Sequence, residues 1–341
     1  MKIQQVIVAS KDEVSLQSLD LNEKNLDPNE MLIETEVSFI SAGTELAIYT
    51  ASDKNVHVPG SWCAYPFKSG YANVGTVLEA GEKYRDLIGK RVYANGPHAS
   101  AYRYKAGSTY SLAAPVSDGL SSEEAVAARM AMVAIAGLDA SKPKYIRTVV
   151  VFGLGMVGNL AAQLFRLTGA VVIGVDPSAT RRRMAKECGI PHVISGTEEE
   201  VAEQVREITG GKLANVTVDA VGHSGVALQA LRVTATAGEV IVLGSPRSDV
   251  PGNLTEVFGA AHYRWITVTG ALEWYYPAES PVEHGYSQRK KLEGIFQWLS
   301  DGRLKLKPMI THVLPPKEIK TAYEGLLHKK EEYVGVVLRW K

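Results

Sequence analysis

Cysteine is scarce in this sequence of 341 residues, which contains only Cys63 and Cys188. Two cysteines are too few for a disulfide framework or for a structural zinc lobe built from four thiolates. The scarcity of cysteine indicates a reducing compartment, and residues 1–10 lack the charged start and the apolar stretch of a signal peptide. We therefore expect a cytoplasmic protein.

Net charge and long apolar runs are lacking as well. Lys and Arg, 37 together, balance 37 Asp and Glu, so the chain has no positive field that could hold a polyanion. Nowhere do about 18 apolar residues follow one another, the length that a membrane helix needs. The composition, 45% hydrophobic and 22% charged, is that of a globular protein with ample core. We expect a small-molecule substrate, and neither nucleic acid nor a membrane as partner.

The apolar pattern divides the chain into two kinds of region. Residues 2–115 carry short alternating apolar runs broken by Gly, Pro, Asn and Asp, which is typical of a curved, barrel-like sheet. A helix-start signal at 121–124 then opens an Ala-rich helix to about residue 140. From Thr148 onward, continuous apolar runs alternate with helical segments, as in parallel strands buried on both faces. The predicted fold class is α/β, with a doubly wound parallel sheet and a β-rich domain.

Some boundaries follow from this pattern. Strands are predicted at 148–152, 170–175, 216–219, 240–243 and 265–269, with helices at 157–167, 181–188 and 224–234 between them. After Leu272 come an aromatic loop, a helix near 288–301 and closing strands at 310–314 and 334–339. This tail is expected to return to the first domain. We therefore predict a β-rich domain of residues 1–125 and 273–341 and a nucleotide-binding domain of residues 126–272.

The strongest local motif is a predicted strand that runs directly into G-x-G-x-x-G and then into a helix. The first glycine permits a tight turn, the second lets the backbone approach a pyrophosphate, and the third lets the helix pack closely on the strand. The N-terminus of that helix offers free N–H groups to the diphosphate. The alternative is that these glycines only shape a turn in a domain that binds something else. The predicted dinucleotide-binding residues of this turn are Gly153, Gly155, Met156, Val157 and Gly158.

An acidic residue ends the next predicted strand. Asp176 is placed to accept hydrogen bonds from the adenosine ribose hydroxyls, and its charge repels a 2′-phosphate. Three arginines follow, Arg181, Arg182 and Arg183, which either neutralise such a phosphate or form a solvated helix face. We assign Arg181 to the cofactor site and expect NAD rather than NADP.

Two glycine-framed segments carry a family resemblance. Gly75–Gly81 and Gly89–Val92 are similar to the G-x-V-x-x-x-G and G-D-R-V elements of the medium-chain dehydrogenase/reductase family, the relatives of zinc alcohol dehydrogenases. Together with the loop Phe152–Gly158, the resemblance covers nearly the whole chain. It implies a GroES-like β-rich catalytic domain and a Rossmann domain. It is weaker toward the bacteriochlorophyllide dehydrogenase branch.

The resemblance also implies further cofactor contacts and an oligomer. In the family, backbone groups after the fourth to sixth Rossmann strands line the adenosine ribose and the nicotinamide, and subunits pair through the sixth strand, here Trp265–Gly270. A homodimer or homotetramer is therefore expected. The matching backbone positions are Gly222, Leu243, Gly244, Ser245, Gly270 and Ala271.

The sequence departs from the family at its catalytic zinc ligands. Ala42 stands in place of the first ligand, a cysteine; Tyr71 stands in place of a histidine; and Arg129 matches the third position within about a residue. None of these side chains is a zinc ligand. We predict a zinc-independent member that binds no metal.

Without zinc, another group must stabilise the negative charge that grows on the substrate oxygen. Tyr71 is the leading hydrogen-bond donor, although it could be an ordinary packed tyrosine. Thr44 matches the hydroxyl that passes the proton outward in zinc relatives, or it caps a helix at 45–49. His98, on a short connection between strands, is a proton shuttle or a plain surface residue.

Candidate substrate contacts come from a few charged and aromatic residues. Arg129 either stabilises an anionic group of the substrate or pairs with a buried carboxylate such as Glu45 or Glu124. Two aromatic clusters, at 62–67 and 274–276, form either hydrophobic plugs or a pocket for a flat, apolar or sugar-like substrate. The predicted substrate-binding residues are Glu45, Trp62, Phe67, Arg129 and Trp274.

Three functions remain open at this point. The first is an NAD-dependent, zinc-independent dehydrogenase that interconverts a secondary alcohol of a polyol, sugar or hydroxyalkyl group and a ketone. The second is an NADPH-dependent enoyl or quinone reductase, against which Asp176 argues. The third is a nucleotide-sensing protein without catalysis.

Overall fold

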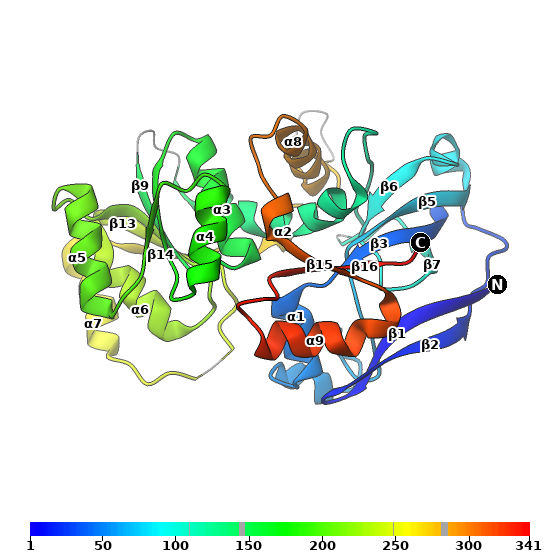
Figure 1. Ribbon diagram of the computed structural model, residues 1–341, viewed down its shortest axis with the longest axis horizontal. Helices are drawn as coiled ribbons and strands as arrows, with labels where there is room; N and C mark the ends of the chain where they lie inside the picture. The colour runs from blue at the N-terminus through cyan, green and yellow to red at the C-terminus, as the bar shows by residue number, and fades with distance from the viewer. Residues whose placement is uncertain (109, 143–146, 248, 281–285) are drawn as a thin grey trace. The chain divides into compact units, whose positions relative to one another are not determined.

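The chain divides into two units, which are described separately (Figure 1). The computed structural model describes all residues except 109, 143–146, 248 and 281–285. One unit, called the β-rich unit here, comprises residues 1–129, 274–302 and 309–341. The other, called the nucleotide unit, comprises residues 130–273 and 303–308. Helix α2 (Ser122–Ala140) begins in the first and continues into the second.

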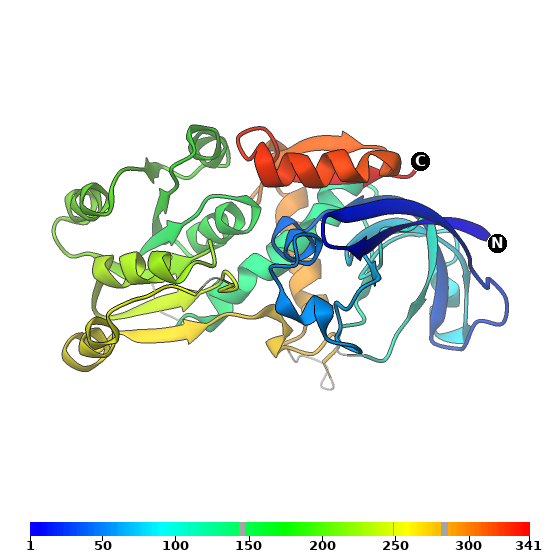
Figure 2. The same ribbon diagram turned by 90° about the horizontal axis from the view of Figure 1, so that it is seen from below.

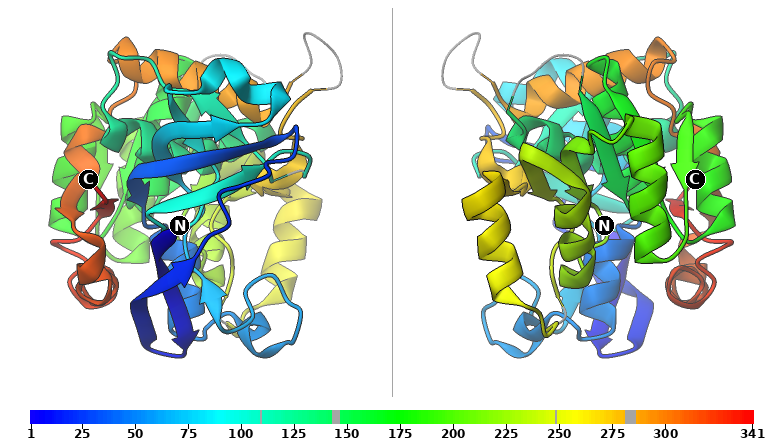
Figure 3. Two further views of the ribbon diagram at one scale, coloured as in Figure 1. Left: turned by 90° about the vertical axis from the view of Figure 1, so that its right-hand side faces the viewer. Right: turned by 90° about the vertical axis from the view of Figure 1, so that its left-hand side faces the viewer.

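The nucleotide unit is built on a parallel sheet of six strands in the order β11-β10-β9-β12-β13-β14. The first strand of the unit, β9, therefore lies in the middle, as in a doubly wound fold. Figure 3, on the right, shows α3 and α4 in green on one side of the sheet and α6 and α7 on the other. The strands are β9 (Thr148–Phe152), β10 (Val171–Val175), β11 (His192–Ile194), β12 (Ala214–Asp219), β13 (Thr234–Val242) and β14 (Thr267–Gly270). The helices are α3 (Met156–Leu167), α4 (Ala179–Glu187), α5 (Glu198–Thr209), α6 (Ser224–Val233) and α7 (Leu254–Arg264).

Burial explains the continuous apolar runs of these strands. Val149, Val150 and Val151 follow one another along β9 and are all fully buried, because helices cover both faces of the sheet. The predicted α/β class with a doubly wound sheet is confirmed.

One predicted strand boundary is wrong. Trp265 does not belong to the sixth strand but ends α7 in the left-handed conformation, with φ +56°, and it is 76% exposed. The strand β14 begins two residues later, at Thr267. The apolar run Trp265-Ile-Thr-Val contains both the helix end and the strand, and periodicity cannot separate them.

In the β-rich unit, strand β3 is the centre of the larger sheet, because it pairs with β5, β7 and β16. That sheet has the order β15-β16-β3-β5-β6-β8, and a smaller one has the order β2-β1-β4. The strands are β1 (Lys2–Ser10), β2 (Glu13–Asp20), β3 (Glu30–Phe39), β4 (Phe67–Lys68), β5 (Asn73–Ala80), β6 (Arg91–Ala94), β7 (Ala101–Lys105), β8 (Ala113–Pro115), β15 (Ile310–Leu314) and β16 (Gly335–Arg339). The helices that lie wholly in this unit are α1 (Ala42–Tyr49), α8 (Gln288–Ser300) and α9 (Ile319–His328).

The end of the chain is part of this unit. Strand β16 pairs with β3, and α9 packs on α1 and β2, which Figure 2 shows as a red helix beside the blue hairpin. Ile319 and Tyr323 of α9 share one buried core with Val6, Ile48 and Val336. Residues from the start and the end of the chain therefore share one core in this unit.

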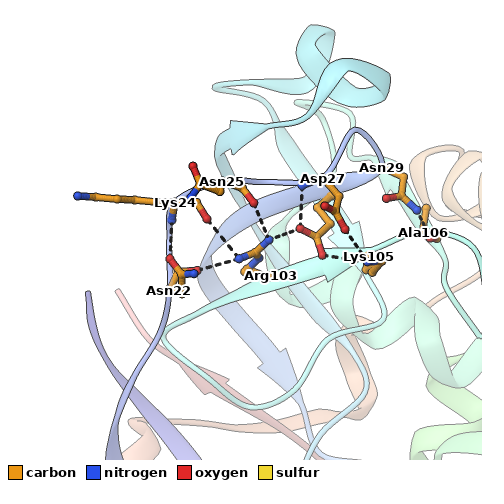
Figure 4. A network of polar contacts seen from close by, with 9 residues as sticks. Asn22, Lys24, Asn25, Asp27, Asn29, Arg103, Lys105 and Ala106 are labelled. Carbon is orange, nitrogen blue, oxygen red and sulfur yellow. Dashed lines mark hydrogen bonds and ion pairs between the residues drawn. The ribbon is translucent and has the colours of Figure 1, made fainter.

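A polar network ties the segment before β3 to β7 (Figure 4). Glu30 accepts hydrogen bonds from Arg103 and from the N–H of Asp27, and Lys105 Nζ lies 2.7 Å from the Asp27 carboxylate. The hydrogen bond from Arg103 is the main cause that lowers the pKa of Glu30. Asn29 Nδ2 donates to the carbonyl of Ala106 at 2.7 Å.

In the part of the chain that the structure describes, no helix has the length and apolar character to cross a bilayer.

Candidate functional site

The glycine turn after β9 has the geometry of a phosphate-binding loop. Gly153 has φ +85°, and a Cβ there would lie 2.6 Å from Val221 Cγ2. A Cβ on Gly158 would lie 1.8 Å from the carbonyl oxygen of Gly153, so only glycine lets α3 approach the turn. At Gly155, the N-cap of α3, a Cβ would meet only Arg181 Nη1, at 4.0 Å. The backbone at Gly155 is therefore open to a ligand.

The first turn of α3 directly follows the glycine turn. Met156 and Val157 form its first turn, with Met156 buried and Val157 half-buried. Gly155 supplies no capping side chain. The first N–H groups of α3 thus have no side-chain acceptor from the N-cap residue, which is what an anion-binding helix N-terminus requires.

Asp176 holds the glycine turn from the end of β10. Its Oδ2 accepts the N–H of Leu154 at 2.7 Å, and its Oδ1 accepts the N–H of Ser178 at 2.8 Å. Asp176 is 2% exposed, yet each carboxylate oxygen can accept a second hydrogen bond. Arg181 Nη1 lies 3.8 Å from Asp176 Oδ2. The carboxylate and this guanidinium therefore both border the turn.

The other two arginines point to different partners. Arg182 Nη1 donates to the carbonyls of Asp176 and Pro177 at 2.8 and 2.7 Å, and Arg183 Nη1 donates to Glu187 at 2.8 Å. These two arginines fit the interpretation as a helix face, and Arg181 does not.

The loops after β12 and β13 touch through their backbones. Gly222 has φ +78°, and a Cβ there would lie 2.5 Å from the Ser245 carbonyl oxygen. A Cβ on Gly244 would lie 2.2 Å from the N atom of Gly222. The N–H groups of Leu243 and Gly244 donate to the Asp219 carbonyl at 3.0 and 2.8 Å. These residues lie at the carboxyl ends of the parallel strands, where ligands bind in such sheets.

The last predicted cofactor residues lie at the end of the sixth strand. Gly270 is the last residue of β14 and is exposed, and the N–H of Ala271 donates to the Val242 carbonyl at 3.0 Å. The sheet therefore brings both residues next to the end of β13.

In the β-rich unit, the buried carboxylate of Glu45 is the centre of a polar cluster. Its Oε1 accepts the N–H of Ser41 at 2.7 Å, and its Oε2 accepts the hydroxyls of Ser69 and Tyr323 at 2.8 and 2.7 Å. His98 Nε2 lies 2.9 Å from the same Oε2. We call these five residues the Glu45 cluster. Because α1, α9 and three connecting segments supply them, the cluster joins residues that are far apart in the sequence.

The charge of Glu45 is favoured despite its burial. Burial alone would raise its pKa, but His98, the Ser41 N–H and the Tyr323 hydroxyl together lower it below the usual value. Glu45 is not the carboxylate that pairs with Arg129, since the oxygens of Glu45 accept from the other members of the Glu45 cluster.

His98 is a core residue. It is fully buried, and its Nδ1 lies 2.8 Å from Ser38 Oγ, which also accepts the Trp340 Nε1–H at 2.9 Å. The interpretation of His98 as a plain surface residue is therefore wrong. Both of its ring nitrogens are bonded inside the unit, so a shuttle role would have to work through Glu45 or Ser38.

Tyr71 is bonded to Ser41, a buried member of the Glu45 cluster. Tyr71 lies half-buried in the loop before β5, and its phenol donates to Ser41 Oγ. Ser41 is the N-cap of α1, which begins at Ala42 rather than at Glu45. Thr44 is a half-buried residue of the first turn, so its predicted role as the helix cap is wrong. Sequence reasoning missed Ser41, although a serine directly before a helix is an ordinary N-cap signal.

Arg129 lies against aromatic rings. Its guanidinium carbon is 4.8 Å from the ring centroid of Tyr71 and 5.1 Å from that of Trp274, and the residue is 1% exposed. The ring of Trp274 in turn contacts Tyr110 edge-on at 4.6 Å. The rings of Trp62 and Phe67 also meet edge-on, with their centroids 6.2 Å apart, and Trp62 is 63% exposed.

The positions of the family's zinc ligands do not fit a zinc ion. Ala42 offers a methyl group, the Tyr71 phenol is bonded to Ser41, and Arg129 is a cation. Among the residues that the structure describes, no group of three His, Cys, Asp or Glu side chains could hold a metal.

A glycine turn on a doubly wound sheet, with an acidic residue at the next strand end and a β-rich second unit, defines a two-domain nucleotide-binding protein of the dehydrogenase kind. The "Zinc-binding dehydrogenase" model matches residues 156–279. D-guloside 3-dehydrogenase of Escherichia coli K12 is 31% identical over 251 residues, which are 73% of this chain and 70% of that protein. The chain belongs to the medium-chain dehydrogenase/reductase family.

Two further comparisons describe the extent of the likeness. L-threonine 3-dehydrogenase of Caldanaerobacter subterraneus subsp. tengcongensis is 28% identical over 184 residues, 53% of this chain, and the match spans about half of that relative, 48%. The crystal structure of 2R,3R-butanediol dehydrogenase from Bacillus subtilis has a TM-score of 0.79 at 18% identity and covers 99% of both chains, which shows a common fold.

Proposed function

We propose that this protein is a zinc-independent, NAD-dependent dehydrogenase that interconverts a secondary alcohol and a ketone. The observation that carries the proposal is the Asp176 carboxylate, which holds the N–H of Leu154 in the glycine turn and has acceptor capacity for two ribose hydroxyls. The named relatives support a dehydrogenase, since both are described as acting on hydroxyl-bearing compounds.

The nucleotide unit would hold the cofactor through its backbone. The open approach at Gly155 and the start of α3 suit the diphosphate, and Arg181 adds a positive charge beside them. The loops at Gly222 and Gly244, with Gly270 at the end of the sixth strand, would line the nicotinamide half. When bound, NAD supplies the hydride acceptor of the reaction.

The β-rich unit would supply the proton. Tyr71 can hold a proton at its phenol oxygen and exchange it with the substrate oxygen, while Ser41 keeps the phenol in place. Thr44 stands in the first turn of the helix that follows Ser41, and it is a second hydroxyl candidate. Glu45 would then hold Ser41 in place, and His98 would hold Glu45, so that neither contacts the substrate.

The substrate is proposed to carry several hydroxyls, as a sugar or polyol does. D-guloside 3-dehydrogenase and butanediol dehydrogenase, by their names, act on such compounds. The exposed ring of Trp62, its neighbour Phe67 and the half-buried Trp274 offer apolar faces of the kind that bind sugar rings.

The function is tested with purified protein by metal analysis and by NADH and NADPH binding and turnover. The turnover panel contains glycosides, polyols, a hydroxyethyl-bearing macrocycle, a quinone and an enone. We expect NAD-dependent oxidation of a polyol or glycoside by protein without stoichiometric metal. Preference for NADPH with turnover of the enone would instead establish a reductase, and tight NADH binding without any turnover would establish a sensor. Stoichiometric zinc would contradict the zinc-independent assignment.

Tyr71→Phe is expected to lower kcat by about 10²- to 10⁴-fold, because the substrate oxygen loses its proton donor. The Kd for NADH should stay unchanged, since the substitution lies in the other unit. Tyr333→Phe serves as the matched control and should keep full activity. Tyr333 stacks on His312, with the two ring centroids 3.7 Å apart. Equal activity of both variants in steady-state assays would remove Tyr71 from the mechanism.

The oligomer is proposed to be a homodimer that pairs through β14. This strand ends the sheet, and large apolar side chains are exposed on it and around it, which indicates a covered surface. Val268→Asp should therefore halve the mass measured by light scattering, whereas Val58→Asp, an exposed valine of the β-rich unit, should not. A wild-type monomer would contradict the proposal, and a tetramer would require a second interface. The exposed side chains are Leu254, Phe258, Tyr263, Trp265, Val268 and Leu272.

A further inference from the structure

Helix α9 buries one face and carries a pocket on its exposed side, which we call the α9 pocket. Ile319 and Tyr323 on the buried face pack in the core of the β-rich unit. The α9 pocket encloses about 420 Å³, which is within the usual range for sites of small molecules. Its residues are separate from the glycine turn and from the Glu45 cluster. They include Lys320, Glu324, Gly325, His328, Lys329 and Tyr333.

A glycine and a fixed aromatic ring give the α9 pocket its shape. Gly325 lies in the interior of α9, where glycine weakens a helix, but a Cβ there would lie 2.5 Å from the ring of Tyr333. The same ring stacks on His312, with the planes at 9°. The N–H of the next residue, Val334, donates to Thr311 Oγ1 at 3.0 Å. The aromatic wall is thus held in place by the protein, which lowers the cost of ordering the pocket when a ligand binds.

The α9 pocket contains more positive than negative charge. In the part of the chain that the structure describes, no carboxylate lies within ion-pair distance of Lys320 or Lys329. The acidic residue among the described lining residues, Glu324, already has partners in the protein. Its Oε1 accepts the hydroxyl of Tyr49 at 2.6 Å, and its Oε2 lies 3.3 Å from His328 Nε2. The two ammonium groups therefore give the pocket an affinity for anionic groups, since lysine binds carboxylate and phosphate as a point charge.

The two lysines stand at opposite ends of the α9 pocket. Lys320 lies in the first turn of α9 and Lys329 is its C-cap, so their backbones are about 13 Å apart along the helix axis. A molecule with an anionic group at each end can contact both ammonium groups, whereas a molecule with one such group contacts one. We propose that the α9 pocket binds an elongated small molecule with two terminal anionic groups, either carboxylates or phosphates. This proposal is independent of the proposed function.

Calorimetric titration of the wild-type protein at low ionic strength tests the spacing of the charges. The probes are acetate, succinate, the longer dicarboxylate suberate, and hexanediol bisphosphate. Suberate or the bisphosphate should bind at least about tenfold more tightly than acetate and succinate, because only the longer molecules reach both lysines. The tighter of the two long probes identifies the anionic group as carboxylate or phosphate. Equal affinities for short and long probes, or no saturable binding of either long probe, would overturn the proposal.

Lys320→Gln and Lys329→Gln should each weaken binding of the tighter long probe by about tenfold, to the level of acetate, because each leaves one charged end of the pocket. Lys317→Gln and Lys330→Gln are the matched controls, since they remove exposed lysines next to the pocket that do not line it. These controls should leave the affinity unchanged. The long probe should also raise the melting temperature of the wild type and not that of the Lys320→Gln, Lys329→Gln double variant. An equal loss of affinity in the controls would show unspecific attraction by surface charge and overturn the proposed site.

Discussion

Glu45→Ala is expected to lower the free energy of unfolding by about 3–5 kcal/mol, because it leaves several buried polar groups without their acceptor. Four groups lose their acceptor at once: the N–H of Ser41, the hydroxyls of Ser69 and Tyr323, and His98 Nε2. Urea unfolding at neutral pH measures the change. Glu79→Ala, which removes an exposed carboxylate of β5, should change the free energy by less than about 0.5 kcal/mol. Similar values for both variants would contradict a central role of the Glu45 cluster.

The same carboxylate should make stability depend on pH. Because the folded-state pKa of Glu45 is lowered, its contribution is fully present above the unfolded pKa of about 4.3 and is lost as the pH falls through the lower folded value. Glu45→Gln has no such titration, so the gap between wild type and this variant should narrow between neutral pH and about pH 3. A gap that is constant over this range would show that folding does not shift the pKa of Glu45.

Gly155→Ala is expected to weaken NADH binding by at least about tenfold, or about 1.4 kcal/mol, with little change in melting temperature. The φ of Gly155 is −63°, which alanine adopts readily, and the new methyl group would meet no protein atom nearer than 4.0 Å. The methyl group would instead stand where the backbone has to approach the diphosphate. Calorimetric titration with NADH, together with thermal unfolding, separates the two effects.

Gly158→Ala should behave in the opposite way. Its Cβ would lie 1.8 Å from the carbonyl oxygen of Gly153, so the turn and α3 must move apart and the nucleotide unit loses stability. Gly294→Ala, on α8, is the control, because a Cβ there meets nothing within 4 Å and should stabilise the helix slightly.

For Gly155→Ala, an NADH affinity equal to that of the wild type would show that the dinucleotide binds elsewhere.

Sequence reasoning was most accurate where the signal is local. The strand Thr148–Phe152, the glycine turn and the start of α3 lie within a few residues of one another, and each has its own stereochemical requirement. Boundaries failed where two elements share one apolar run, as at Trp265, and where a helix starts before the residue expected to cap it, as α1 does at Ala42.

The Glu45 cluster could not be predicted from the sequence. Glu45 and Tyr323 are 278 positions apart, and neither residue lies in a pattern that points to the other. His98 stands in an ordinary Gly-Pro-His-Ala segment, and only the packing of β1 and the neighbouring loops buries it completely.

The amino-acid order alone predicted the doubly wound sheet, the glycine turn with its acidic partner, and the departures from the family's zinc-ligand pattern, because each depends on residue types at short spacing. Only the tertiary structure decided that Ser41, rather than Thr44, meets the Tyr71 phenol, and that Arg129 lies over its ring. Such contacts depend on where separate strands and helices bring their side chains, and chain spacing carries no record of that placement.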